Sequence, residues 1–197
     1  MEISVFSSGF YNADPNLFSA VQKRSLRITD SIESFSKSAS QKTTVFISHK
    51  HDDLEALKPL ITLLEREYSV ETYIDSKDSL MPKVTNSETA ARIKNMINQC
   101  DKFILLATDG AIESKWCNWE LGYGDAAKFT KKSIAIFVFS NTKDAKGCEY
   151  MKLYPYILYS DGNEKYSNGN IIKKGLYVVR QTNEERIFMP LSDWLKA

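Results

Sequence analysis

From residue 42 onward, short apolar segments alternate with longer amphipathic segments, and this order restricts the possible fold more than any other feature. The predicted strands are TTVFIS (43–48), VETYID (70–75), KFILLAT (102–108) and SIAIFVFS (133–140). The predicted helices are residues 52–68, residues 89–100 and a segment that Ser114 caps and that ends near Lys128. Strands that alternate with helices indicate βαβ units, and therefore an α/β fold with a parallel sheet covered on both faces.

The end of the chain is less regular. ILY (157–159) or LYVV (176–179) supplies a fifth strand, so we expect a central sheet of about five strands. LSDWL (191–195) predicts a closing helical turn. Residues 76–88 and 162–170 have no period and are predicted to be loops.

Residues 1–41 differ from the rest and form a predicted N-terminal extension. Asp14-Pro15 is a helix-start signal, because proline is favoured in the first turn. Apolar residues then recur at roughly helical spacing at Leu17, Val21, Ile28, Ile32 and Phe35, before a Ser-rich linker. An amphipathic helix of this kind packs either on its own domain or on another subunit.

Composition excludes several classes of function. The formal net charge is +1, which gives no electrostatic reason to expect nucleic acid or an anionic membrane as partner. The longest apolar runs are of strand length, and the N-terminus lacks the features of a signal peptide. Three cysteines without CxxC spacing and two histidines favour reduced thiols in a cytoplasmic protein, with no structural metal.

In parallel sheets, ligands bind outside the carboxyl ends of the strands. We therefore expect three segments along one edge: ISHKHDD (47–53), the loop from Asp75, and Thr108 to Glu120. No GxGxxG or GxxxxGK[ST] motif occurs there, which argues against a standard dinucleotide fold and a P-loop nucleotide-binding protein.

The segment SKWCNWELGYGDA (114–126) places Glu120 among aromatic residues. On a helix, Trp116, Trp119, Glu120 and Tyr123 share one face, where burial disfavours a charged carboxylate. Three interpretations follow: Glu120 is a structural residue paired with backbone amides or an arginine, a catalytic residue at the strand ends, or part of an aromatic contact surface. Two helical glycines, at 122 and 124, are expected to permit close approach by a neighbouring segment or a ligand.

These segments together resemble a bacterial Toll/interleukin-1 receptor (TIR) domain over roughly residues 42–160, with residues 161–197 completing the domain. The matching motifs are strand-SH-x-x-x-D, a strand that ends in YID, and S-x-W-x-x-x-E; their residues are Ser48, His49, Asp53, Tyr73, Ile74, Asp75, Ser114, Trp116 and Glu120. The resemblance implies a flavodoxin-like TIR fold and an activity on NAD+, which serves as substrate, with no separate cofactor.

Enzymatic TIR domains cleave the bond between nicotinamide and ribose, and the resemblance assigns the catalytic role to Glu120. The chemistry is consistent, because bond cleavage builds positive charge on the ribose and a nearby carboxylate opposes that charge. The cationic pyridinium suits an aromatic wall formed by Trp116 or Trp119. The other residues expected to bind substrate are Ile47, Ser48, His49, Asp53, Asp75 and Ser114.

Two of these positions leave alternatives open. His49 is either an ordinary polar residue or an acid–base group. The loop that begins at Asp75 covers the substrate and contacts a neighbouring subunit in related TIR domains. Here the loop keeps Pro82 but lacks the receptor-type Arg-Asp before it and the Gly after it.

The favoured function is an NAD+ nucleosidase or cyclase of bacterial antiphage defence, similar to the TIR subunit of Thoeris systems. It would act as a homo-oligomer and produce ADP-ribose or a cyclic signal for a separate effector protein. The alternatives are a non-catalytic TIR scaffold and a nucleoside deoxyribosyltransferase-like enzyme. Residues 76–88 are the expected donor segment to a neighbouring site, and the N-terminal helix is expected to hold the subunits together. Deleting residues 1–40 should therefore lower both oligomer mass and activity and leave a folded core.

Overall fold

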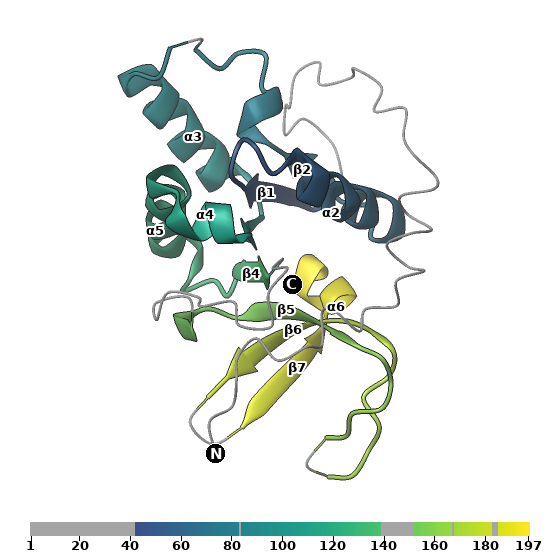
Figure 1. Ribbon diagram of the computed structural model, residues 1–197. Helices are drawn as coiled ribbons and strands as arrows, with labels where there is room; N and C mark the ends of the chain where they lie inside the picture. The colour runs from purple at the N-terminus through teal and green to yellow at the C-terminus, as the bar shows by residue number, and fades with distance from the viewer. Residues whose placement is uncertain (1–41, 83, 139–151, 167, 183–184) are drawn as a thin grey trace.

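A computed structural model describes residues 42–82, 84–138, 152–166, 168–182 and 185–197, and shows one seven-stranded sheet with helices on both faces (Figure 1). The N-terminal helix expected between residues 14 and 35 lies outside the described residues. No helix in the described part of the chain is both long and apolar enough to cross a membrane.

The strand order is β2-β1-β3-β4-β5-β6-β7. The strands are β1 (Thr44–Ser48), β2 (Glu71–Tyr73), β3 (Lys102–Ala107), β4 (Ile134–Val138), β5 (Tyr156–Ser160), β6 (Gly175–Gln181) and β7 (Arg186–Pro190). The first five are parallel, and β6 and β7 pair antiparallel at one edge.

The expected central parallel sheet of about five strands is present as β1 to β5, and two antiparallel strands that were not expected in that arrangement extend it at one edge. Both candidate fifth strands are present, and β7 is additional. A parallel partner for β5 would need a long crossover connection, whereas antiparallel strands can be joined by a short one. The connection between β5 and β6 has no helix among its described residues, so the chain simply turns back.

The two faces of the sheet carry separate hydrophobic cores. Helices α2 (Leu54–Glu67) and α6 (Leu191–Lys196) cover one face, where Leu57, Leu64 and Trp194 pack on strand residues such as Ile47. Helices α3 (Ser87–Gln99) and α5 (Lys115–Lys128) cover the other face, together with the short α4 (Asp109–Glu113). Because side chains alternate along a strand, Ile47 and its neighbour Ser48 point to opposite faces. Ser48 thus faces α5.

Local capping explains where the helices on the α5 face begin. The Ser114 hydroxyl accepts the backbone N–H of Cys117 at 3.3 Å, which confirms the predicted start of α5. Helix α3 begins two residues before the predicted start, because Asn86 caps it by accepting the N–H groups of Glu88 and Thr89 at 2.9 and 3.0 Å. Thr108 similarly caps the unexpected helix α4.

A neighbouring segment of the described chain approaches only one of the two glycines in α5 closely. A Cβ added at Gly124 would lie 2.9 Å from the ring of the buried Phe103 on β3, whereas one at Gly122 would meet nothing within 4 Å. We expect Gly124→Ala to destabilise the fold by about 1–3 kcal/mol, because the helix must move off the sheet. Gly122→Ala should stabilise it by about 0.5–1 kcal/mol through helix propensity. Urea unfolding of both variants checks this, and equal effects at the two positions would contradict it.

Candidate active site

The three segments expected along one sheet edge are in contact. Ser48, the last residue of β1, donates a hydrogen bond of 2.5 Å to Oε2 of Glu120 on α5. Thr108, directly after β3, donates to the carboxylate of Asp53. Nδ1 of His49 lies 3.7 Å from Oδ1 of Asp75, which follows β2. The segments after β1, β2 and β3 therefore meet at one edge of the sheet, where Ser48 bonds to Glu120.

Glu120 is almost completely buried, with 1% of its surface exposed. Its Oε1 atom is also buried and has no hydrogen-bond partner among the described residues. Neither an arginine nor a backbone amide of the described chain bonds to the carboxyl group, so the structural interpretation of Glu120 lacks the partners it requires. Oε1 is thus without a hydrogen-bond partner among the described residues and is available to a ligand.

The electrostatic environment favours the protonated form of Glu120. Burial is the main cause and the negative charge of Asp75 adds to it, while the Ser48 hydroxyl and the Trp116 side chain act in the opposite direction. Together they raise the pKa of Glu120 from 4.5 to about 8. A cation placed beside Glu120 would reverse this preference, because an opposite charge stabilises the carboxylate.

His49 connects the end of β1 to the segment after β2. Its ring is buried, and Nε2 lies 3.2 Å from the hydroxyl of Ser76. Burial lowers the pKa of His49, with Asp75 acting in the opposite direction. The balance favours a neutral ring at pH 7. His49 therefore holds Asp75 and Ser76 in place, and a neutral imidazole beside a carboxylate keeps an acid–base role open.

The aromatic residues of α5 divide into two groups. Trp116 and Trp119 are half-buried, with ring centroids 5.0 Å apart. Trp119 and Tyr123 lie toward α3, where Nζ of Lys94 is 5.7 Å and 5.5 Å from their ring centres. Trp119 thus already contacts a cation of the protein, whereas Trp116 lies one helical turn before Glu120 and affects its pKa. Trp116 is the better candidate for an aromatic wall.

Comparison with known proteins agrees with this geometry. The family described as TIR domain matches residues 45–168, which is more than half of the chain and includes all three converging segments. The chain belongs to the TIR domain family. Strands β6 and β7 and helix α6 of this TIR domain lie beyond the match, yet they extend the same sheet and the same core.

Two curated relatives are informative. A Bacillus cereus (strain MSX-D12) protein named "Probable 3' cyclic ADP-D-ribose synthase ThsB'" is 25% identical over 154 residues, which cover 77% of this chain and 75% of the relative. A Cytobacillus dafuensis protein named "Putative cyclic ADP-D-ribose synthase TIR2" is 30% identical over 82 residues, or 40% of this chain and 21% of the relative. The TIR domain described here is thus similar to bacterial proteins of the Thoeris type.

Three residues expected to bind substrate have structural contacts, and their role in substrate binding stays a prediction. The Ile47 side chain belongs to the core on the α2 face, away from Glu120. Ser114 caps α5, and Asp53 accepts the Thr108 hydroxyl. Asp75 lies close enough to raise the pKa of Glu120, so it remains at the site together with Ser48, His49 and Trp116.

Sequence reasoning missed the network that holds the loop after β2. Asp78 accepts hydrogen bonds from the Tyr73 hydroxyl at 2.6 Å, from Nε and Nη2 of Arg92 on α3, and from the Leu80 amide. The Arg92 and Tyr73 bonds hold the pKa of Asp78 below its usual value even though burial opposes them. The sequence did contain a signal for this network. An aspartate lies in the predicted loop, and an arginine that could pair with it lies on the following predicted helix. This network fixes the loop beside the site.

Proposed function

We propose that this chain is an NAD+-cleaving enzyme of bacterial antiphage defence that forms a cyclic ADP-ribose-type product. The observation that carries the proposal is the buried Glu120 carboxyl group, with one oxygen bonded to Ser48 and the other without a partner in the described chain. The two relatives, each named as a cyclic ADP-D-ribose synthase, support the same reaction class.

The reaction breaks the bond between the nicotinamide nitrogen and C1′ of the ribose. The bonding electron pair leaves with nicotinamide, which becomes neutral, and positive charge develops on the ribose ring. The Glu120 carboxylate would oppose this charge and accept hydrogen bonds from the ribose hydroxyls. Trp116 would face the pyridinium ring, whose positive charge is lost as the bond breaks.

The second half of the reaction decides the product. Attack on C1′ by an atom of the same ADP-ribose unit closes a ring, whereas attack by water gives free ADP-ribose. A buried glutamate limits water at the reacting carbon, which favours ring closure. In both cases the nucleophile loses a proton, which a carboxylate or the neutral His49 could accept.

Product analysis tests the proposal. The protein is incubated with NAD+ and the products are separated and identified by mass spectrometry. We expect free nicotinamide together with a product lighter than ADP-ribose by one water molecule. Equal amounts of nicotinamide and ADP-ribose would keep the NAD+-cleaving function and reject cyclisation. Unchanged NAD+ at every protein concentration would favour the non-catalytic scaffold.

We further propose that the enzyme acts as a homo-oligomer whose product is sensed by a separate effector protein. The loop after β2 presents two exposed apolar side chains, Leu80 and Val84, which are 68% and 75% exposed. Apolar side chains at this exposure, beside the site, suit contact with a second copy of the chain.

The double variant Leu80→Ser/Val84→Ser tests this proposal. We expect a smaller mass by light scattering and at least about tenfold lower turnover at low protein concentration, because each lost apolar contact weakens association. The melting temperature should change little, since both side chains are exposed. Ile171→Ser, at a position that is 61% exposed on the β5–β6 connection, is the matched control. Unchanged mass and activity in the double variant would reject this contact.

A further inference from the structure

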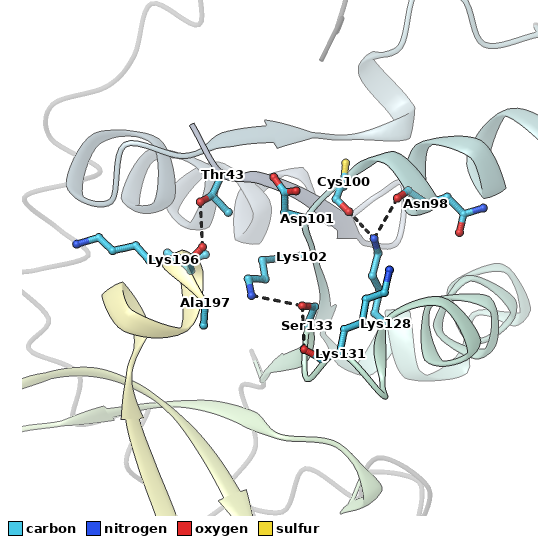
Figure 2. A pocket seen from close by; sticks show the side chains of 11 residues that line it. Thr43, Asn98, Cys100, Asp101, Lys102, Lys128, Lys131, Ser133, Lys196 and Ala197 are labelled. Carbon is cyan, nitrogen blue, oxygen red and sulfur yellow. Dashed lines mark hydrogen bonds between the residues drawn. The ribbon is translucent and has the colours of Figure 1, made fainter. Parts of the chain in front are cut away.

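The opposite edge of the sheet, at the amino ends of β1, β3 and β4, contains a polar pocket of about 390 Å³ (Figure 2). Residues that line it include Thr43, Lys102, Lys128, Lys131, Ser133 and Lys196. It lies one strand length from the Glu120 site, roughly 15–20 Å away along β1 and β3. Four lysines and one acidic side chain, Asp101, give the lining side chains a net charge of +3 (4 − 1).

Lys102 is the unusual member of this set. Its side chain is nearly fully buried, with 3% of the residue exposed. Among the described residues its ammonium group contacts only the Ser133 hydroxyl, at 3.3 Å, and the face of the Trp194 ring, at 5.0 Å. No described carboxylate lies within ion-pair distance of it; burial lowers the pKa of Lys102, and the charge of the neighbouring Asp101 opposes this only in part. Buried lysines are normally paired, because burial of an uncompensated charge is costly.

The other cations have different roles. Lys128 is also buried, but its Nζ donates to the backbone carbonyls of Asn98 and Cys100 at the end of α3, so its hydrogen bonds are already used there (Figure 2). Lys131 and Lys196 are exposed at the pocket rim. Lys102, Lys131 and Lys196 are therefore the cations available to a ligand, and the Ser133 hydroxyl lies beside the buried one.

We propose that this pocket binds a small phosphate-bearing anion, whose phosphate group pairs with Lys102 and Ser133 and is held at the rim by Lys131 and Lys196. A phosphate supplies several acceptor oxygens and the negative charge that Lys102 lacks. The pocket volume lies within the usual range for small-molecule sites. The site is separate from Glu120 and does not depend on the NAD+ reaction.

Calorimetric titration of the full-length protein with inorganic phosphate, at constant ionic strength, tests the proposal. We expect saturable binding that Lys102→Met weakens at least about tenfold, because the charge-assisted hydrogen bond is lost while the aliphatic stem still packs on Trp194. Lys173→Gln, an exposed lysine on the β5–β6 connection, is the control and should bind as the wild type does. Glu120→Gln should also bind phosphate normally.

Titration with AMP identifies the source of the phosphate. If AMP binds more tightly than phosphate and its binding also depends on Lys102, the pocket is a nucleotide site. If AMP and phosphate bind equally, the pocket recognises the phosphate group alone. If Lys102→Met does not fold, the exposed pair Lys131→Gln/Lys196→Gln replaces it, with an expected weakening of at least about threefold. Phosphate that does not bind the wild type saturably, or that binds a folded Lys102→Met variant equally well, overturns the proposal.

Discussion

The Glu120→Gln variant is expected to release nicotinamide from NAD+ at least about 100-fold more slowly than the wild type. Glutamine has nearly the same size and can still accept the Ser48 hydroxyl, so the fold should be retained. What is lost is the negative charge beside the developing positive charge on the ribose. Steady-state nicotinamide release, measured by chromatography at saturating NAD+, gives the ratio.

The matched control for this prediction is Glu113→Gln. Glu113 lies on the neighbouring helix α4 and is exposed, so its charge is screened by water and turnover should remain close to that of the wild type. Near-normal turnover in a folded Glu120→Gln protein would reject Glu120 as the catalytic residue. It would also leave the unpartnered oxygen of Glu120 without an explanation.

The second large effect is on stability as a function of pH. The pKa of Glu120 is raised from 4.5 to about 8 in the folded protein, chiefly by burial. The unfolded chain therefore loses this proton at lower pH than the folded chain does. Between pH 4.5 and about 8 the folded state holds more protons, so the contribution of Glu120 to stability falls as pH rises.

Glu120→Gln removes this ionisation and should be more stable than the wild type at pH 8.5, by on the order of 5 kcal/mol, with little difference at pH 4.5. Urea unfolding of both proteins at a series of pH values gives the difference, in which other titrating groups largely cancel. A difference that stays constant across the pH range would contradict the burial argument. NAD+ binding should oppose the trend, because a cation beside Glu120 favours its ionised form.

The parallel part of the fold could be predicted because its signals are local. The β1, β3 and β4 segments are continuous apolar runs that both faces of the sheet bury, and Ser114 is a standard helix cap. The antiparallel edge is different. The side chains of β7 alternate in exposure, but the exposed positions are the apolar Ile187 and Met189, so its sequence lacks the apolar–polar alternation that predicts a half-buried strand. Its pairing with β6 decides its conformation.

The position of the candidate site in the fold could be predicted from the sequence, but the contacts of its aromatic side chains could not. The rule that ligands bind at the carboxyl ends of parallel strands places Ser48, Asp75 and Glu120 at one edge, and the structure has them close together there, while their roles stay predictions. The helical period predicted that Trp119 shares the face of Glu120. In the structure the rings of Trp119 and Tyr123 instead contact the ammonium group of Lys94 on α3. Contacts between separate helices of this kind have no signature in the spacing of residues along one helix.

The most direct test of this account is a crystal structure of the Glu120→Gln variant with intact NAD+ bound. We expect the nicotinamide ring to lie against Trp116 and C1′ of its ribose to be in van der Waals contact with the side chain at position 120, beside Ser48. NAD+ bound at the carboxyl edge with its nicotinamide pointing away from position 120, or bound elsewhere on the molecule, would contradict it.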